Sequence, residues 1–173
     1  MVFDSLGASG VITYSSDIKY DERGNFLEIY NQSSLELFGA QRFVQQNLVL
    51  SNLNVIRGMH WQKNPYEQSK LITVLKGRIL DVFLDMRTES DTYSKVFSVE
   101  LNSKYAQSIF IPAGFAHGYQ ALEQDTLISY SVTSKYSPDH ENRINPLSNK
   151  FKKFWMEPYL IGELDLRSNY QDD

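Results

Sequence analysis

The chain has 173 residues, no cysteine and a formal net charge of −4 at pH 7. This length suits a single domain over residues 1–173, the missing cysteines exclude disulfide scaffolds, cysteine nucleophiles and thiolate metal sites, and the acidic balance argues against nucleic-acid binding. Because the first residues lack a signal-peptide pattern and no stretch approaches the about 18 apolar residues of a membrane span, we expect a cytoplasmic protein with no membrane contact.

The first part of the chain predicts a turn, a strand and a short helix. Residues 21–24 (Asp-Glu-Arg-Gly) are typical of a turn, and 25–30 of a strand. Ser33 and Glu36 have the spacing of a capping box, so we expect a short helix that begins at Ser33 and that Gly39 ends. It is the only helix predicted before the C-terminal part.

The rest of the chain predicts mainly strands, because apolar residues recur with a period close to two. Lys76-Gly77 predicts a hairpin turn, and turn residues recur about every 8–12 positions, which is typical of an antiparallel sandwich or barrel. After Asn142 the pattern weakens into loops and a possible short helix. The expected strands are 43–51, 55–61, 70–75, 79–84, 95–101, 107–111, 117–121 and 126–133.

The chain has three histidines, and two of them are candidates for a site. His60 has no second histidine two residues away, and His117 stands alone after a Pro-Ala-Gly turn. A small β-barrel that binds a metal usually offers His-x-His on one strand, so we expect no metal here.

Polar side chains within apolar strands indicate a lined cavity. Arg57, His60, Gln62 and Lys70 lie within fourteen positions on neighbouring predicted strands. Strict alternation would point Arg57 and His60 to opposite faces, so we expect a β-bulge at Gly58. For His60 alone, a hydrogen-bonded core histidine is the alternative.

Other polar strand residues have simpler interpretations. Tyr130 lies mid-strand, where a packed core tyrosine is the alternative to a catalytic one. Asp81 and Asp85 alternate with apolar residues, which favours a solvated strand face. Glu141 follows a proline turn, where a surface position is the default.

A histidine base, a lysine, a tyrosine acid and a carboxylate suit one reaction. The base removes a proton next to a carbonyl, and the acid returns a proton to the other face. The lysine ammonium would stabilise the enolate, and this chemistry needs no cofactor.

From about Val11 to Asp165, the chain resembles the dTDP-4-dehydrorhamnose 3,5-epimerase family of cupin-fold nucleotide-sugar epimerases. The resemblance rests on many short segments in the family's order. They are 21–24, Phe26, Glu28, 43–47, 57–62, 68–71, 77–82, 85–87, Ser90, 92–93, 111–118, Tyr130, Tyr136, Pro138 and Glu141. The resemblance implies an all-β, cupin-type antiparallel jelly-roll barrel with short peripheral helices. It also implies a homodimeric isomerase without cofactor or metal that acts on a nucleotide-diphosphate 4-keto-6-deoxy sugar in surface polysaccharide biosynthesis.

The resemblance also assigns roles to residues. His60 would be the base, Asp165 its carboxylate partner and Tyr130 the acid on the opposite face. Lys70 and His117 would hold the keto sugar and its enolate. Substrate binding would involve Arg23 and Arg57 at the diphosphate and Glu28, Gln45 and Asn47 on the nucleotide side, with Tyr136 and Glu141 also in the site. In this family Arg23 comes from the partner subunit.

Several positions depart from the family pattern. Leu48 and Val49 stand where the family has His-Ser, Ser131 replaces a lysine, Lys135 a tyrosine, and Leu164 a lysine. Another sugar or nucleotide, and epimerisation at C3 only or C5 only, therefore stay open. Two further alternatives are a 3,4-ketoisomerase on the same scaffold and a non-catalytic sugar-binding cupin.

Overall fold

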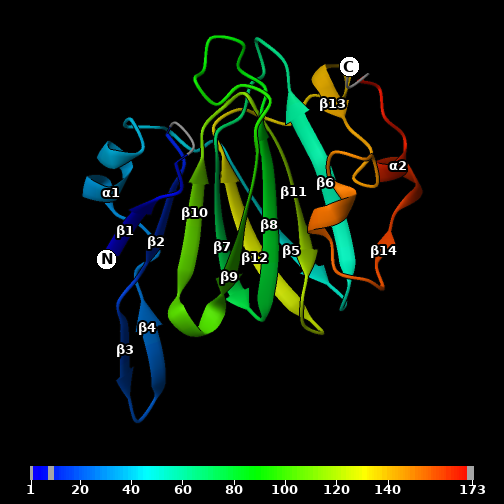
Figure 1. The fold of residues 1–173 in the computed structure, drawn as a ribbon. Helices are drawn as coiled ribbons and strands as arrows, with labels where there is room; N and C mark the ends of the chain where they lie inside the picture. Colours follow the sequence, from blue (N-terminus) through cyan, green and yellow to red (C-terminus); the bar gives the residue numbers. More distant parts are fainter. Residues whose placement is uncertain (1, 8–9, 171–173) are drawn as a thin grey trace.

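The computed structural model describes residues 2–7 and 10–170, most of them in strands (Figure 1). Two short helices, α1 (Gln32–Leu37) and α2 (Glu163–Leu166), and the 3₁₀ turns η1 (Ser103–Tyr105), η2 (Pro138–His140) and η3 (Lys152–Phe154) lie at the periphery. The strands are β1 (Val2–Ser5), β2 (Ile12–Ser15), β3 (Ile18–Asp21), β4 (Gly24–Leu27), β5 (Gln45–Ser51), β6 (Val55–Gln62), β7 (Lys70–Lys76), β8 (Arg78–Asp85), β9 (Val96–Asn102), β10 (Gln107–Ile111), β11 (Phe115–Ala121), β12 (Thr126–Val132), β13 (Glu141–Arg143) and β14 (Leu160–Ile161).

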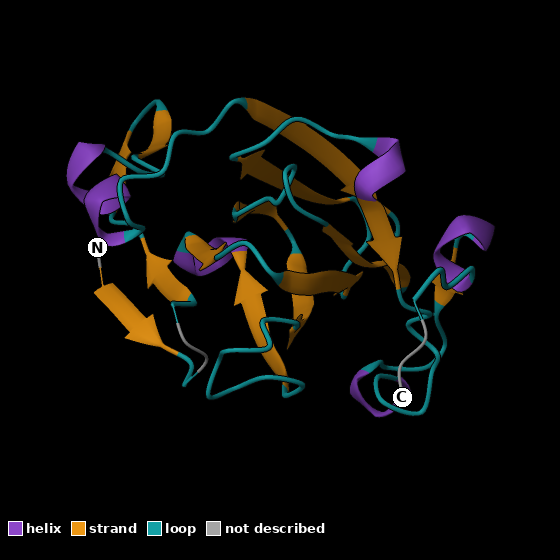
Figure 2. Cartoon of the chain, turned by 90° about the horizontal axis from the view of Figure 1, so that it is seen from above, coloured by secondary structure: helices purple, strands orange, loops and turns teal. Residues whose placement is uncertain are grey.

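Two sheets face each other across the core, as the view from above shows (Figure 2). The first sheet has the order β1-β2-β10-β7-β12-β5, and the second has the order β13-β6-β11-β8-β9 with β14 beside β6. In these two sheets, the pairs β1-β2 and β8-β9 are consecutive in sequence, and the other neighbouring strands are distant. All pairs are antiparallel except β14, which joins β6 in parallel. The expected all-β jelly-roll architecture is confirmed. Among the described residues, no helix has the length and apolar character needed to cross a membrane.

Apolar side chains fill the space between the sheets and also cover the outer face of the second sheet. Ile72 and Ile109 of the first sheet pack with Ile79 and Phe83 of the second in one buried cluster. A separate buried cluster on the other side of the second sheet joins its strands to the C-terminal segment. It comprises Ile56, Met59, Trp61, Val82, Leu84, Ala116, Ile144, Phe151 and Trp155. Strand β8 is therefore buried on both faces.

The predicted hairpin at Lys76-Gly77 is wrong, although both predicted strands form. Strand β7 belongs to the first sheet and β8 to the second, so the chain crosses from one sheet to the other at this point. Gly77 has φ +81°, and a Cβ atom there would lie 2.6 Å from Oγ1 of Thr126. The glycine thus serves a tight corner between sheets rather than a hairpin.

The predicted helix forms, but its first residue differs from the expectation. The N-cap is Asn31, whose side chain accepts a hydrogen bond from the Ser34 amide (3.1 Å), and the Ser34 hydroxyl in turn accepts from the Asn31 amide (2.8 Å). Asparagine caps helices as well as serine does, so the capping box starts two residues earlier than Ser33. Gly39, with φ +77°, follows the last helical turn as expected.

The expected bulge at Gly58 is confirmed. Arg57 is opposite Tyr119 in the register of β6 and β11, whereas His60 is opposite His117, so two residues of β6 face one residue of β11. Gly58 has φ +118°, and a Cβ atom there would lie 2.4 Å from the Gly118 Cα. The extra residue brings Arg57 and His60 to the same cavity.

Strands β3 and β4 form a two-stranded ribbon that projects away from the barrel (Figure 1). The predicted turn at 21–24 lies at its tip, where Asp21 pairs with Gly24. Tyr20 and Phe26 expose 73% and 66% of their surface on this ribbon. Within one chain, the ribbon leaves large apolar side chains uncovered.

Candidate active site

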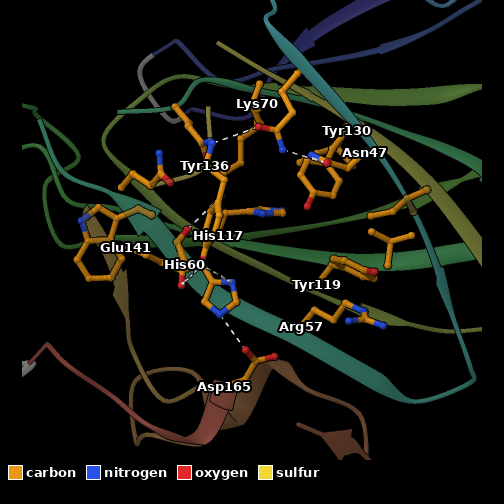
Figure 3. Close-up of a pocket in the computed structure, with 18 residues that line it drawn as sticks. Asn47, Arg57, His60, Lys70, His117, Tyr119, Tyr130, Tyr136, Glu141 and Asp165 are labelled. Atoms are coloured by element: carbon orange, nitrogen blue, oxygen red, sulfur yellow. Dashed lines mark hydrogen bonds and ion pairs between the residues drawn. The ribbon is translucent and has the colours of Figure 1, made fainter. Parts of the chain in front are cut away.

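A cavity of about 470 Å³ lies between the two sheets and collects most of the predicted site residues (Figure 3). The first sheet contributes an apolar wall together with Lys70 and Tyr130, and the second contributes Arg57, His60 and His117. The apolar wall consists of Val49, Ile72, Ile128 and Val132. A polar wall that faces an apolar wall is suited to a small molecule that has both polar groups and apolar surface.

His60 and Asp165 form a close pair, as expected. Nε2 of His60 lies 2.8 Å from Oδ1 of Asp165, and the Gly58 amide donates to Oδ2 of the same carboxylate (3.4 Å). Along the outer edge of β6, β14 pairs with residues 55–56 and β13 with residues 60–62, and Asp165 takes the position between them. Because the carboxylate accepts a hydrogen bond from Nε2–H, Nδ1 of His60 keeps a lone pair that can take a proton.

Lys70 links the two walls. Its side chain is buried, and Nζ donates to the main-chain carbonyl of His60 (3.1 Å). Burial lowers the pKa of Lys70 to about 8, against the opposing charges of Asp81 and Glu141. The ammonium is therefore still the main form at pH 7, in a setting where its field is little screened by water.

His117 is held by a carboxylate that the sequence interpretation missed. Its Nε2 lies 2.8 Å from Oδ2 of Asp81, and Asp81 is completely buried. Burial lowers the pKa of His117, although Asp81 opposes this effect. The expected solvated face is wrong for Asp81, since the C-terminal segment covers the other face of β8 and the inward face carries Asp81 beside Ile79 and Phe83.

The same expectation is wrong for Asp85, which is also completely buried. Its carboxylate accepts hydrogen bonds from Arg87 (2.8 Å), Ser90 (2.6 Å) and Thr92 (2.6 Å). It does not line the cavity, so it holds the loop after β8 in place rather than taking part in the site.

Tyr130 lies on the wall opposite His60, on β12 (Figure 3). Burial raises its pKa, while the Arg57 charge acts in the other direction. Its hydroxyl therefore stays protonated at neutral pH. Arg57 itself donates through Nε to Oγ of Ser51 (3.2 Å), and this hydroxyl lies 2.9 Å from the hydroxyl of Tyr119. Ser51 and Tyr119 were not predicted, because nothing local marks them.

Four further predicted residues lie together at one side of the cavity. Tyr136 donates through its hydroxyl to Glu141 (3.2 Å), and Gln45 accepts from the Tyr136 amide (3.1 Å) and donates to Asn47 (3.0 Å). Glu141 is not a surface residue, because its side chain is only 11% exposed and Oε1 lies 4.0 Å from Nδ1 of His60. The expected surface position of Glu141 is thus wrong.

Two predicted site residues lie away from the cavity of the single chain. Arg23, at the tip of the ribbon, has an 83% exposed side chain and pairs with Asp21. Glu28 follows β4 and accepts from Asn31 (2.7 Å). Over residues 2–7 and 10–170, no group of three or more histidine, aspartate or glutamate side chains is placed to hold a metal ion.

Comparisons with known proteins agree on one family. The sequence model described as dTDP-4-dehydrorhamnose 3,5-epimerase matches residues 5–171. The enzyme of that name from Methanothermobacter thermautotrophicus is 37% identical over 82% of this chain and 77% of its own length. The crystal structure from Elizabethkingia anophelis has a TM-score of 0.88 at 31% identity and covers 97% of this chain and 94% of its own.

A third relative was solved with a sugar nucleotide. The Legionella pneumophila dTDP-6-deoxy-D-glucose-3,5-epimerase, in complex with dTDP-4-keto-L-rhamnose, has a TM-score of 0.88 at 32% identity. The match covers 95% of this chain and 89% of that one.

Burial of Lys70 predicts a specific pH dependence of stability. Between about pH 8 and its ordinary pKa of 10.5, Lys70 is neutral in the folded chain but protonated in the unfolded chain. The unfolded state then binds more protons, so this group makes folding more favourable as the pH rises. From pH 7 to 10, we expect the unfolding free energy of the wild type to rise by about 2–3 kcal/mol relative to Lys70→Met.

Urea unfolding at several pH values measures this difference. Lys76→Met is the matched control, because the Lys76 side chain is 63% exposed. The difference in unfolding free energy between the wild type and Lys76→Met should stay constant over this pH range. A constant difference between wild type and Lys70→Met across this range would contradict a buried ammonium.

Proposed function

Since the chain belongs to the dTDP-4-dehydrorhamnose 3,5-epimerase family, whose members are isomerases, we propose that its cavity epimerises a nucleotide-diphosphate 4-keto-6-deoxy sugar. The inversion takes place at C3, at C5 or at both, next to the C4 ketone. One observation carries the proposal: the His60–Asp165 pair and Tyr130 lie on opposite walls of one cavity. An inversion requires a base and an acid on opposite faces of the ring.

His60 is the base in this mechanism. Asp165 accepts a hydrogen bond from Nε2–H, which leaves Nδ1 to remove the proton next to the ketone. The imidazolium that forms lies between two carboxylates, because Asp165 lies 2.8 Å from one nitrogen and Glu141 4.0 Å from the other. These charges stabilise the protonated base in the enolate complex.

Lys70 stabilises the enolate. Its buried ammonium, charged at neutral pH, provides a positive charge where the C4 oxygen becomes negative. His117 is held neutral by burial and donates a hydrogen bond from Nε2–H to Asp81, so its other ring nitrogen is an acceptor suited to a sugar hydroxyl. Lys70 thus stabilises the negative charge, and His117 orients the sugar.

Tyr130 is the acid. Its hydroxyl belongs to the first sheet, and its burial keeps it protonated until it donates to the enolate carbon. Arg57 is the cation proposed for the diphosphate, with Gln45, Asn47, Tyr136 and Glu141 completing the binding surface.

We further propose a cytoplasmic homodimer of one-domain subunits in which Arg23 and Glu28 complete the partner's site. The ribbon supports this, because it carries Arg23 and exposed aromatic side chains away from its own barrel. A chain without cysteine suits a reducing compartment. The product would serve deoxysugar and surface polysaccharide biosynthesis.

The base is tested by His60→Asn in deuterated water. With a dTDP-4-keto-6-deoxy sugar, we expect exchange of the protons next to the ketone to fall by about 10²–10⁴-fold, as for other general bases. Proton NMR measures exchange and inversion together. His140→Asn is the matched control, because that histidine bonds Ser137 outside the cavity. Near-wild-type exchange in His60→Asn would exclude it as the base.

The acid is tested by the ratio of exchange to inversion in Tyr130→Phe. Without the hydroxyl, His60 still forms the enolate and returns a proton to the original face, so exchange continues while net inversion falls by much more. Tyr105→Phe, at an exposed tyrosine on η1, is the control. If the ratio is the same as in the wild type, Tyr130 is only a packing residue.

The shared site is tested by mixing two inactive variants. Arg23→Ala weakens binding in both sites of its dimer, and His60→Asn lacks the base in both. When subunits exchange, a mixed dimer contains one site with His60 from one chain and Arg23 from the other, so we expect up to half of the wild-type activity per mixed dimer. Light scattering should give a dimer at micromolar concentration. A monomer, or no recovered activity after proven exchange, contradicts the proposal.

A further inference from the structure

The carboxylate that pairs with His60 lies on a segment that cannot hold itself in place. Helix α2, which carries Asp165, has four residues and none of them is buried. Its side chains at Glu163 and Leu164 are exposed. An isolated helix of this length is not stable in water. The 2.8 Å contact between Asp165 and His60 therefore depends on what fixes the segment at its two ends.

The upstream end is fixed by main-chain bonds. Strand β14 pairs with Val55 and Ile56 of β6, and the Leu160 amide donates to the Asn54 carbonyl (2.9 Å). The next residues, Gly162 to Leu166, leave the sheet and pass beside the edge of β6. This anchor alone leaves Asp165 four residues beyond the last strand residue.

The downstream end is fixed by Asn169. Its side-chain oxygen accepts from the Arg143 amide (2.7 Å), its side-chain nitrogen donates to the Glu141 carbonyl (3.0 Å), and its main-chain amide donates to the Arg143 carbonyl (3.2 Å). One residue thus acts as an additional short strand beside β13. Arg143 is the residue opposite His60 in the register of β13 and β6. Asn169 is therefore attached to the strand residue that pairs with the base.

Neighbouring residues support the same anchor. The Ser168 hydroxyl donates to the Arg143 carbonyl (3.0 Å), and the Tyr170 ring meets the Trp61 ring edge-on at 5.2 Å. Asn169 does not line the cavity. It is exposed, and its hydrogen bonds join it to strand β13, so it has no direct route to the substrate.

We propose that Asn169 is a positioning residue that holds Asp165 against His60. The inference rests on the proposed role of Asp165 as partner of the base. When the two side-chain hydrogen bonds of Asn169 are lost, the downstream end keeps only one main-chain bond and the contacts of Ser168 and Tyr170. The α2 segment then loosens, and the carboxylate moves away from Nε2 of His60. Misplacement of a catalytic group by about 1 Å can lower the rate by about 10²-fold.

A double-mutant cycle tests this role. We expect Asn169→Ala to lower kcat by about 10–100-fold with little change in KM, because the diphosphate and sugar contacts are untouched. Asp165→Asn should lower kcat at least as much. Asn169→Ala should then have almost no further effect in the Asp165→Asn background, since it acts through a carboxylate that is already absent. Arg167→Ala is the control, because its 72% exposed side chain is in the same segment and pairs only at 3.9 Å with Glu163.

Amide hydrogen exchange gives a readout that does not depend on substrate. In Asn169→Ala, exchange over residues 162–168 should become faster while the strands of the barrel stay protected; Arg167→Ala should leave it unchanged. Multiplicative losses in the double variant, or unchanged exchange, would overturn the role. Coupling to Glu141→Gln in place of Asp165→Asn would also overturn it, because Asn169 also bonds the Glu141 carbonyl. If Asp165→Asn itself keeps full activity, it is the proposed function that fails, whatever the exchange data show.

Discussion

The close approach of two backbones at Gly58 and Gly118 is the constraint on which the site depends. In a regular strand Arg57 and His60 would point to opposite sides of the sheet. The bulge brings both to the cavity, and it requires φ +118° at Gly58 with the Gly118 Cα 2.4 Å from where a Cβ atom would lie. A Cβ atom at Gly118 would lie 2.8 Å from the Arg57 carbonyl oxygen. The same bulge leaves the Gly58 amide free to donate to Asp165, so one backbone feature places the arginine, the histidine and the carboxylate.

Charge is distributed in pairs around the cavity. His60 contacts Asp165, His117 contacts Asp81, and the buried ammonium of Lys70 lies in the field of Asp81 and Glu141. A buried charge without a partner would be neutralised by a large pKa change. Here the carboxylates moderate the effect of burial, so Lys70 remains cationic near pH 7 while His117 remains neutral. Lysine and histidine, both basic residues, therefore differ in charge within one small volume.

Local patterns predicted most of the strands and the polar residues of β6 and β7 in the cavity, whereas Asp165 and most other site residues were assigned by the family resemblance. Alternation of apolar residues located β5 to β12, and the conflict between Arg57 and His60 located the bulge. Asp81 was misjudged because both faces of β8 are buried. Phe151 and Trp155, about 70 residues later, cover the face of Val82 and Leu84, so the face of Asp81 is the one that turns toward the first sheet. The corner at Gly77 was misjudged for a similar reason, since a turn residue does not reveal which sheet the next strand joins. No local pattern predicted the proposed role of Asn169, because that role comes from contacts with a strand 26 residues earlier.

The position of Asp165 at the edge of the second sheet has a consequence for the chemistry. Asp165 reaches the imidazole from the edge of β6, between β13 and β14, so it lines the cavity on the side of His60 and not on the opposite wall. In the proposed mechanism, His60 acts from the second sheet while Lys70 and Tyr130 act from the first. Two sheets that pack face to face hold these groups at a fixed separation, so a ring between them can lose a proton to one wall and gain one from the other without turning over.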